Sequence, residues 1–266
     1  MTWSTGWAMV TAGFRRQSAY RLAMLAGLVA NMTFGLIRSA QLSAASQSAG
    51  GSLAGYEHDQ LMSFVWVSQG LLGAVNLFGS TEIASRIKDG QVAVDFLRPT
   101  SVVGQYLATD LGRALYTFVP RGIPSVLVGA ATTGVAFATA PLHWVAGGVG
   151  VLLGIAIAYL SAHCLATLGF WFVETRGFEA TYMVTTTFLA GLYLPVSMFP
   201  GWLAAIAHAS PFPSMLQRPV DVLVGRTTGL DVWTSLATQA GWFLVMLALA
   251  LVLTRAGRHT LEIQGG

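Results

Sequence analysis

The sequence has little charge for its length. Only 9% of its 266 residues are Asp, Glu, Lys or Arg, whereas 54% are hydrophobic. Soluble domains usually carry about 25% charged residues, so a water-soluble fold of this size could not cover its surface. The apolar residues also form long blocks instead of alternating with polar ones, which is the pattern expected when lipid is the solvent. The composition therefore predicts a protein buried in a bilayer.

Residues and motifs that carry enzyme chemistry are also scarce. Cys164 is the single cysteine and lies within an apolar block, which excludes an intrachain disulfide and argues against a cysteine metal cluster. The five histidines show no HxxxH or HExxH spacing, and the chain has neither a GxSxG elbow nor a GxxxxGK[ST] phosphate-binding loop. We therefore expect no catalytic residue, no metal site and no cofactor bound by this chain.

The basic residues are few and dispersed. The net charge is only +3, and the 14 Lys and Arg residues cluster at the ends of the apolar blocks and not on one dense face. This distribution argues against a nucleic-acid partner and is typical of residues that set membrane topology.

The first 19 residues carry aromatic side chains at helical spacing, such as Trp7 and Phe14, followed by two arginines. This pattern predicts an amphipathic helix at 1–19 in the membrane interface. The alternative is a cleaved signal peptide, which Arg38 disfavours because it interrupts the apolar stretch before any good cleavage site.

Residues 20–266 are expected to form one transmembrane domain. The block Ala180–Gln217 has 38 residues without Asp, Glu, Lys or Arg and is broken by four prolines, so we expect a fifth span followed by a re-entrant hairpin at 195–217. The predicted fold is an all-α membrane protein with about six transmembrane helices, at 20–40, 61–81, 114–138, 144–173, 178–194 and 232–254.

The basic residues also predict an orientation. With both termini cytoplasmic, only Arg38, Arg218 and Arg226 lie outside and Arg121 lies in the membrane, so the other ten of the 14 basic residues are inside. This asymmetry follows the positive-inside rule and predicts a multi-pass protein of the cytoplasmic membrane.

Residues 82–99, between the second and third spans, lie in the longest charged segment of the chain. They predict two short helices, one stopped by Gly90 and one by Pro99. Apolar residues between paired charges suit docking into a groove of a soluble partner. A solvated loop with ordinary helix-end charges is the alternative, and the residues alone do not decide between the two.

Two motifs resemble a known family. EIASRIKDG at 82–90, followed by LRP at 97–99, resembles the cytoplasmic coupling segment of type-2 ABC (ABC-2) exporter permeases. GLYLPVSMFPGWL at 191–203, with SPF at 210–212, resembles the outer re-entrant hairpin of the same family. Together with the helix order, the resemblance covers nearly the whole chain. Within the family, the chain most resembles the viologen-exporter-like subfamily.

The resemblance implies a division of labour. A second permease subunit, identical or homologous, would complete the path, and two copies of a cytosolic ABC ATPase, which bind ATP and Mg, would drive it. One departure is Gln91, where family members often carry an acidic residue. The implied ATPase-coupling residues are Glu82, Ile83, Arg86, Ile87, Lys88, Asp89, Gly90, Asp95, Phe96, Arg98 and Pro99.

Two further groups are candidates for the transport path. Arg121, Glu174 and Glu179 are candidate charges at its inner mouth, although Arg121 could instead snorkel or pair with one of the two acids, and the acids could cap a cytoplasmic turn. The outer-gate candidates, which could alternatively form an aromatic belt at the lipid headgroups, are Tyr193, Pro195, Phe199, Pro200, Trp202, Pro211 and Phe212.

The expected function is export of a hydrophobic or amphiphilic substrate, such as a drug, antibiotic or lipid-like molecule, with membrane lipids as neighbours. An ion-coupled secondary transporter is one alternative, but it would normally show midplane acids and an internal repeat. A membrane enzyme or scaffold is the other, and it would be marked by a convergent polar cluster that the sequence does not indicate.

Overall fold

The computed structural model describes residues 3–264, and the side chains of residues 3–260. In this part of the chain the only strands are β1 (Ser52–Leu53) and β2 (Tyr56–Glu57), which pair antiparallel in a small hairpin. The remaining elements are the helices α1 (Trp3–Ser18), α2 (Arg21–Ser48), α3 (His58–Leu71), α4 (Glu82–Lys88), α5 (Val92–Phe96), α6 (Val102–Thr117), η1 (Phe118–Gly122), α7 (Ile123–Thr132), α8 (Pro141–Thr167), η2 (Leu168–Phe170), α9 (Arg176–Leu189), η3 (Val196–Met198), α10 (Gly201–His208), α11 (Phe212–Met215), α12 (Gln217–Leu223) and α13 (Leu230–Gln264).

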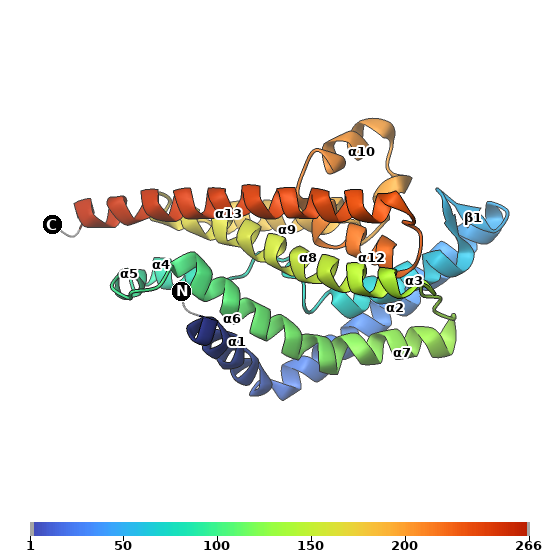
Figure 1. The fold of residues 1–266 in the computed structure, drawn as a ribbon, viewed down its shortest axis with the longest axis horizontal. Coiled ribbons are helices and arrows are strands. Elements are labelled where there is room, and N and C mark those ends of the chain that lie inside the picture. The colour runs from blue at the N-terminus through green and yellow to red at the C-terminus, as the bar shows by residue number, and fades with distance from the viewer. Residues whose placement is uncertain (1–2, 265–266) are drawn as a thin grey trace.

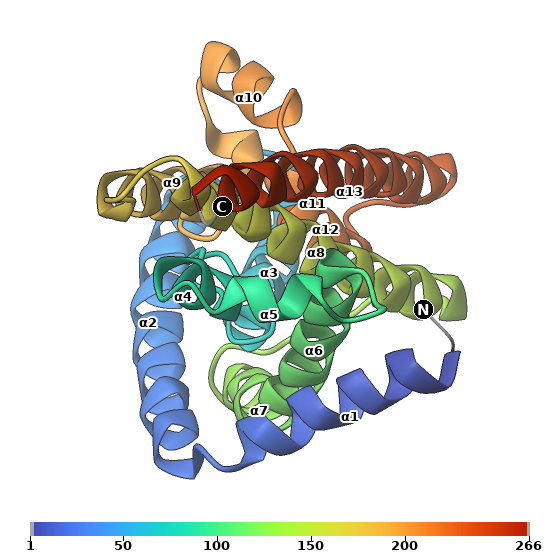
Figure 2. The same ribbon diagram turned by 90° about the vertical axis from the view of Figure 1, so that its left-hand side faces the viewer.

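The long helices run roughly along one axis of the molecule (Figure 1). α4, α5, α1 and the C-terminal part of α13 lie at one end, which we call the α4 end, and the β1–β2 hairpin lies at the opposite end, the β1 end. Seen from the α4 end, α1 crosses the bundle at an angle, and α10 projects from the opposite side beyond α13 (Figure 2). The two ends of the described chain therefore lie on the same side.

Four helical stretches are long and apolar enough to cross a membrane: Arg21–Ser48, Val102–Thr132, Pro141–Phe170 and Leu230–Thr260. They overlap four of the six spans predicted from the sequence and confirm an all-α membrane protein. The helix of the third predicted span begins at Val102, where the Ser101 side chain accepts a hydrogen bond from the Gly104 backbone N–H, and not near residue 114. Its charged residues Asp110 and Arg113 pair with each other across one helical turn.

The other two predicted spans are shorter helices. α3 and α9 have 14 residues each, or about 21 Å of helix at 1.5 Å per residue. α3 ends at Leu71 and not near 81, and α9 ends at Leu189 and not near 194. The count of six crossings therefore stays a prediction.

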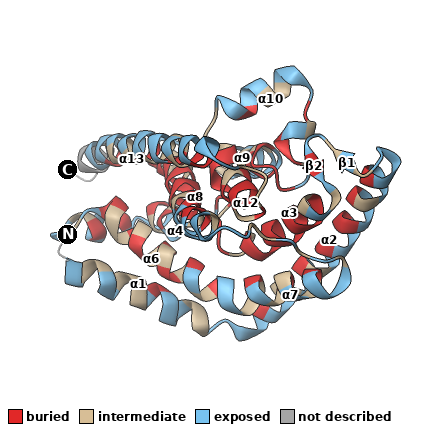
Figure 3. Ribbon diagram, turned by 45° about the vertical axis from the view of Figure 1, so that its right-hand side comes forward, coloured by how far each residue is buried: buried red, intermediate tan, exposed pale blue. Residues whose placement is uncertain are grey.

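α3 is the centre of the core. Every residue from Leu61 to Leu71 is buried, including the polar Ser63, Ser68 and Gln69. Buried residues concentrate in α3, α8 and α12, whereas α10 and the outer faces of α2 and α13 are exposed (Figure 3). Just beyond the C-terminus of α3, the carbonyls of Gly73 and Ala74 accept hydrogen bonds of 2.9 Å from Arg113 Nη1 and Nη2, respectively. These carbonyls follow the end of the helix and need an outside donor.

α1 packs closely on α6. A Cβ atom at Gly13 would overlap the carbonyl oxygen of Thr109, so only glycine permits this approach of the two backbones. The edge-to-face contact of Phe14 with Tyr116, at 5.1 Å between ring centroids, adds to the same junction. The predicted N-terminal helix is therefore held against the bundle, while Trp3 and Trp7 on its other face remain exposed.

Candidate functional site

The predicted coupling segment consists of two short helices at the α4 end. α4 and α5 are separated by a turn in which Gly90 has a φ of +71°, a conformation that favours glycine. The turn and much of the second helix are exposed. The sequence thus placed the helix stop at Gly90 correctly.

Asp95 holds the segment together from inside. Its side chain is only 1% exposed and accepts hydrogen bonds from Arg86 Nε at 2.6 Å and Arg86 Nη2 at 3.0 Å. The hydroxyl of Tyr106 on α6 donates to the same carboxylate at 2.8 Å. A two-point contact with arginine is among the stronger polar contacts in proteins, and here the hydrogen bond to Asp95 raises the pKa of Arg86. α4, α5 and α6 are therefore fastened at one carboxylate.

The apolar residues of α4 also face the chain itself. Ile83 and Ile87 are buried in the main hydrophobic core, so these residues and Asp95 support the segment and do not present their side chains to a partner in this structure. The exposed apolar residues are instead Val94 and Leu97, at 54% and 85% exposure. They lie three residues apart, the spacing of residues on one helical face. This spacing is the signal in the sequence that could have identified them as the residues exposed to a partner.

The remaining predicted coupling residues are also partly buried against the chain and partly exposed. Phe96 is half-buried, with its ring 6.3 Å from that of Phe170 and the Arg258 guanidinium 5.8 Å from its centroid. The exposed members are Glu82, Lys88, Asp89, Gly90, Arg98 and Pro99.

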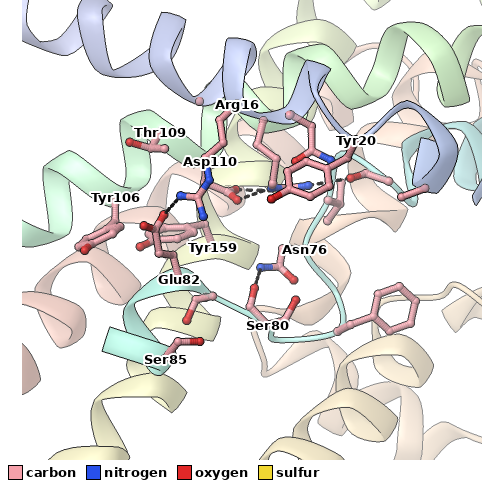
Figure 4. A pocket seen from close by; sticks show the side chains of 18 of the residues that line it. Arg16, Tyr20, Asn76, Ser80, Glu82, Ser85, Tyr106, Thr109, Asp110 and Tyr159 are labelled. Carbon is pink, nitrogen blue, oxygen red and sulfur yellow. Dashed lines mark hydrogen bonds and ion pairs between the residues drawn. The ribbon is translucent and has the colours of Figure 1, made fainter. Parts of the chain in front are cut away.

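A second connection joins the segment to the N-terminal helix. Arg16 on α1 forms an ion pair with Glu82 at the start of α4, and Figure 4 shows the two side chains meeting across a cavity. Both partners are substantially exposed, so the pair contributes little stability by itself. Its effect is to place α1 and α4 in direct contact.

The cavity between α1, α4 and α6 has a volume of about 760 Å³. Most of the residues that line it are polar, among them Tyr20, Asn76 and Tyr159, with Asp110 on the α6 side (Figure 4). Arg113 also lines it and pairs with Asp110 at 2.6 Å. The cavity therefore lies directly behind the predicted coupling segment.

Arg121 lies in a wide helical turn between α6 and α7. Pro120 and Pro124 lack backbone N–H groups, and the chain forms the five-residue π turn η1 between α6 and α7. From this turn the Arg121 side chain reaches α2 and lines the cavity, where its Nη2 donates to Asn31 Oδ1 at 3.0 Å.

The three predicted inner-mouth charges do not meet. Glu174 accepts a hydrogen bond from the Arg176 backbone N–H at 3.1 Å, which lowers the pKa of this carboxyl, and Glu179 accepts one from the Thr175 hydroxyl at 2.8 Å. Neither acid forms an ion pair with Arg121 among the described residues. Glu174 lies two residues before α9, and Glu179 lies in its first turn.

The predicted outer-gate residues do not converge on one point either. Phe199 is buried and stacks on Phe188 at 4.9 Å, and Phe212 makes an edge-on contact with Tyr182 at 6.5 Å. Tyr193 and Trp202, in contrast, are exposed. The prolines Pro195, Pro200 and Pro211 each precede a short helix, namely η3, α10 and α11.

Sequence reasoning missed a buried polar network near the β1 end. The Tyr56 hydroxyl donates to Asp221, which also accepts from Gln217 Nε2 and Arg226 Nη1, each at 3.3 Å. Gln217 Oε1 accepts the Val196 backbone N–H at 2.7 Å. The network joins the β1–β2 hairpin to the predicted re-entrant segment. Because Tyr56 and Asp221 are 165 positions apart, no local pattern could have indicated it.

His163 has structural surroundings, and the neighbouring Cys164 is buried. His163 is buried, with its ring nitrogens 2.9 Å from the Thr254 hydroxyl and 3.2 Å from the Tyr159 hydroxyl, and it joins α8 to α13. Across the described part of the chain no group of three or more His, Cys, Asp or Glu residues could hold a metal ion.

Comparison with known proteins gives one match. A family model described as "ABC-2 family transporter protein" matches residues 41–265. No curated protein and no solved structure matches the chain. The matched range includes the predicted coupling segment and the outer hairpin.

Proposed function

This chain belongs to the ABC-2 transporter family and is a membrane permease subunit, and from that premise we propose that it exports a hydrophobic or amphiphilic substrate with energy supplied by a separate ATPase. The family works in general with a partner ATPase. The proposal gives residues 82–99 the role of receiving that partner.

The observation that carries the proposal is that residues 82–99 have one exposed apolar face and one buried polar attachment. Val94 and Leu97 are exposed to solvent, while the buried Asp95 accepts hydrogen bonds from Arg86 on α4 and Tyr106 on α6. A force applied to the exposed face would pass through Asp95 and Tyr106 into the long helix α6–α7. An isolated solvated loop would need no such buried fastening.

The further parts of the proposal follow from the family resemblance and the charge distribution. The α4 end would face the cytoplasm, with both termini inside the cell and the protein in the cytoplasmic membrane. Two permease subunits, identical or homologous, would work with two ATPase subunits that bind ATP and Mg. The viologen-exporter-like subfamily, and a drug, antibiotic or lipid-like cargo, are the narrower forms of the proposal.

Purification in mild detergent tests the partner. We expect a soluble ATP-binding protein to co-purify with the tagged chain, and Leu97→Glu to reduce its amount at least fivefold. The matched control is Leu230→Glu. Leu230 is 82% exposed, against 85% for Leu97, but it is the first residue of α13 and lies away from the α4 end. Equal recovery of the ATPase with both variants would remove the coupling role from α5.

A further inference from the structure

The cavity behind α4 contains one arginine that has no ion-pair partner among the described residues. Arg16, Arg86, Arg113 and Arg121 all line it. The first three form ion pairs with Glu82, Asp95 and Asp110, respectively. Arg121 forms none with any described acid.

The Arg121 guanidinium is held in place despite lacking an acid. Its Nη2 donates to Asn31 Oδ1 at 3.0 Å and to the Gly27 carbonyl at 3.4 Å, while its Nε is buried without a partner. A Cβ atom at Gly27 would overlap the guanidinium carbon. The chain therefore fixes this cation against α2 instead of leaving it free to extend to the surface.

The position makes an unpaired charge costly. Gly27 lies six residues after Arg21, so Arg121 contacts α2 about 9 Å along the helix from its start. A charged group inside the membrane boundary normally pairs with another group or marks a ligand path. Arg113 lies two helical turns away and adds a second cation, while Asp110 supplies one negative charge for the two. Asp89 also lines the cavity, but it is exposed after α4 and forms no ion pair with Arg121. A bound anion would give Arg121 the charged partner that it lacks.

The surroundings suit an anion that carries an apolar tail. Tyr20 and Phe78 line the cavity and are exposed, as expected of aromatic side chains at a lipid headgroup boundary. Ala23 of α2 and Leu72, just after α3, also line the cavity and supply apolar surface on which the start of an acyl chain could pack.

We propose that Arg121, positioned by Asn31, binds the phosphate of an anionic amphiphile whose headgroup enters the cavity between α1, α2 and α6. The guanidinium is suited to this role because its planar donors match phosphate oxygens. The inference concerns binding by this chain and does not rest on the proposed export function.

Native mass spectrometry of the full chain in mild detergent tests the site. We expect the protein to retain dioleoyl phosphatidylglycerol in preference to dioleoyl phosphatidylcholine, and Arg121→Gln to reduce the retained phosphatidylglycerol at least fivefold. Arg218→Gln is the matched control, since Arg218 also has a buried Nε without a partner but belongs to α12 and lines a different pocket. Equal retention of phosphatidylglycerol by all three proteins would overturn the proposal.

Two further arms complete the test. Gly27→Ala keeps the charge but displaces the guanidinium, so it should also lose phosphatidylglycerol, and it decides the question if Arg121→Gln does not fold. Inorganic phosphate should leave the unfolding temperature of the unsubstituted chain unchanged. Stabilisation by phosphate that disappears in the Gly27→Ala variant would assign the site to a free anion and contradict the amphiphile.

Discussion

At the scale of single residues, most charges near the α4 end are paired inside the chain. Asp95, Asp110 and Glu82 each take an arginine partner, and the first two carboxylates are buried. Burial of an unpaired charge is strongly unfavourable, so these pairs determine which side chains can reach a partner molecule. The sequence placed Asp95 in the predicted coupling segment. It could not show that the side chain points inward, because that orientation depends on the hydrogen bonds from Arg86 and Tyr106.

Asp95→Asn tests this fastening. The amide keeps the size of the side chain but cannot form the ion pair with Arg86, so the protein should lose about 1–3 kcal/mol of stability. Thermal unfolding in detergent measures the change, and Asp89→Asn, at an exposed position in the adjacent turn, should leave the unfolding temperature unchanged. A similar decrease in both variants would show that Asp95 has no special role.

At the scale of helices, the sequence predicted the long apolar elements well. α2, α8 and α13 coincide with predicted spans because each has an uncharged core long enough for a membrane. α3 shows where this reasoning fails. The chain remains apolar beyond Leu71 but leaves the helix, since hydropathy reports burial and not backbone conformation. Irregular backbone is tolerated there because protein donors, such as Arg113, satisfy its carbonyls.

The α1–α6 junction gives a prediction at this scale. Gly13→Ala should lower the unfolding temperature, because the new methyl group overlaps Thr109 and forces the two helices apart. The matched control is Gly241→Ala in α13, where a Cβ atom meets nothing within 4 Å and alanine favours the helix. Circular dichroism with heating measures both variants. An unchanged unfolding temperature for Gly13→Ala would mean that α1 does not pack on α6 in the membrane.

At the scale of the whole molecule, the two ends differ in character. The α4 end carries the exposed α4–α5 segment and the ion pairs around it, whereas the β1 end carries the Tyr56–Asp221 network and the hairpin. The basic residues predict which end faces the cytoplasm. Both ends of the described chain lie on one side of the molecule. The direction relative to the cell remains a prediction.

Cysteine labelling tests that direction. In a Cys164→Ser background, a cysteine at Ser48 should react with a membrane-impermeant maleimide in intact cells. A cysteine at Gln91 should react only after permeabilisation. Both positions are exposed and lie near opposite ends of the molecule. The reverse labelling pattern would invert the proposed topology.

The central claim, that a separate ATPase grips residues 82–99, is tested most directly by photo-crosslinking in cells. A photoreactive benzoyl-phenylalanine at Leu97 should form a covalent adduct with a soluble ATP-binding protein, identified by mass spectrometry, whereas the same group at Leu230 should not. If Leu97 crosslinks to no such protein while the tagged chain still exports its substrate, the assignment of this segment to ATPase coupling is contradicted.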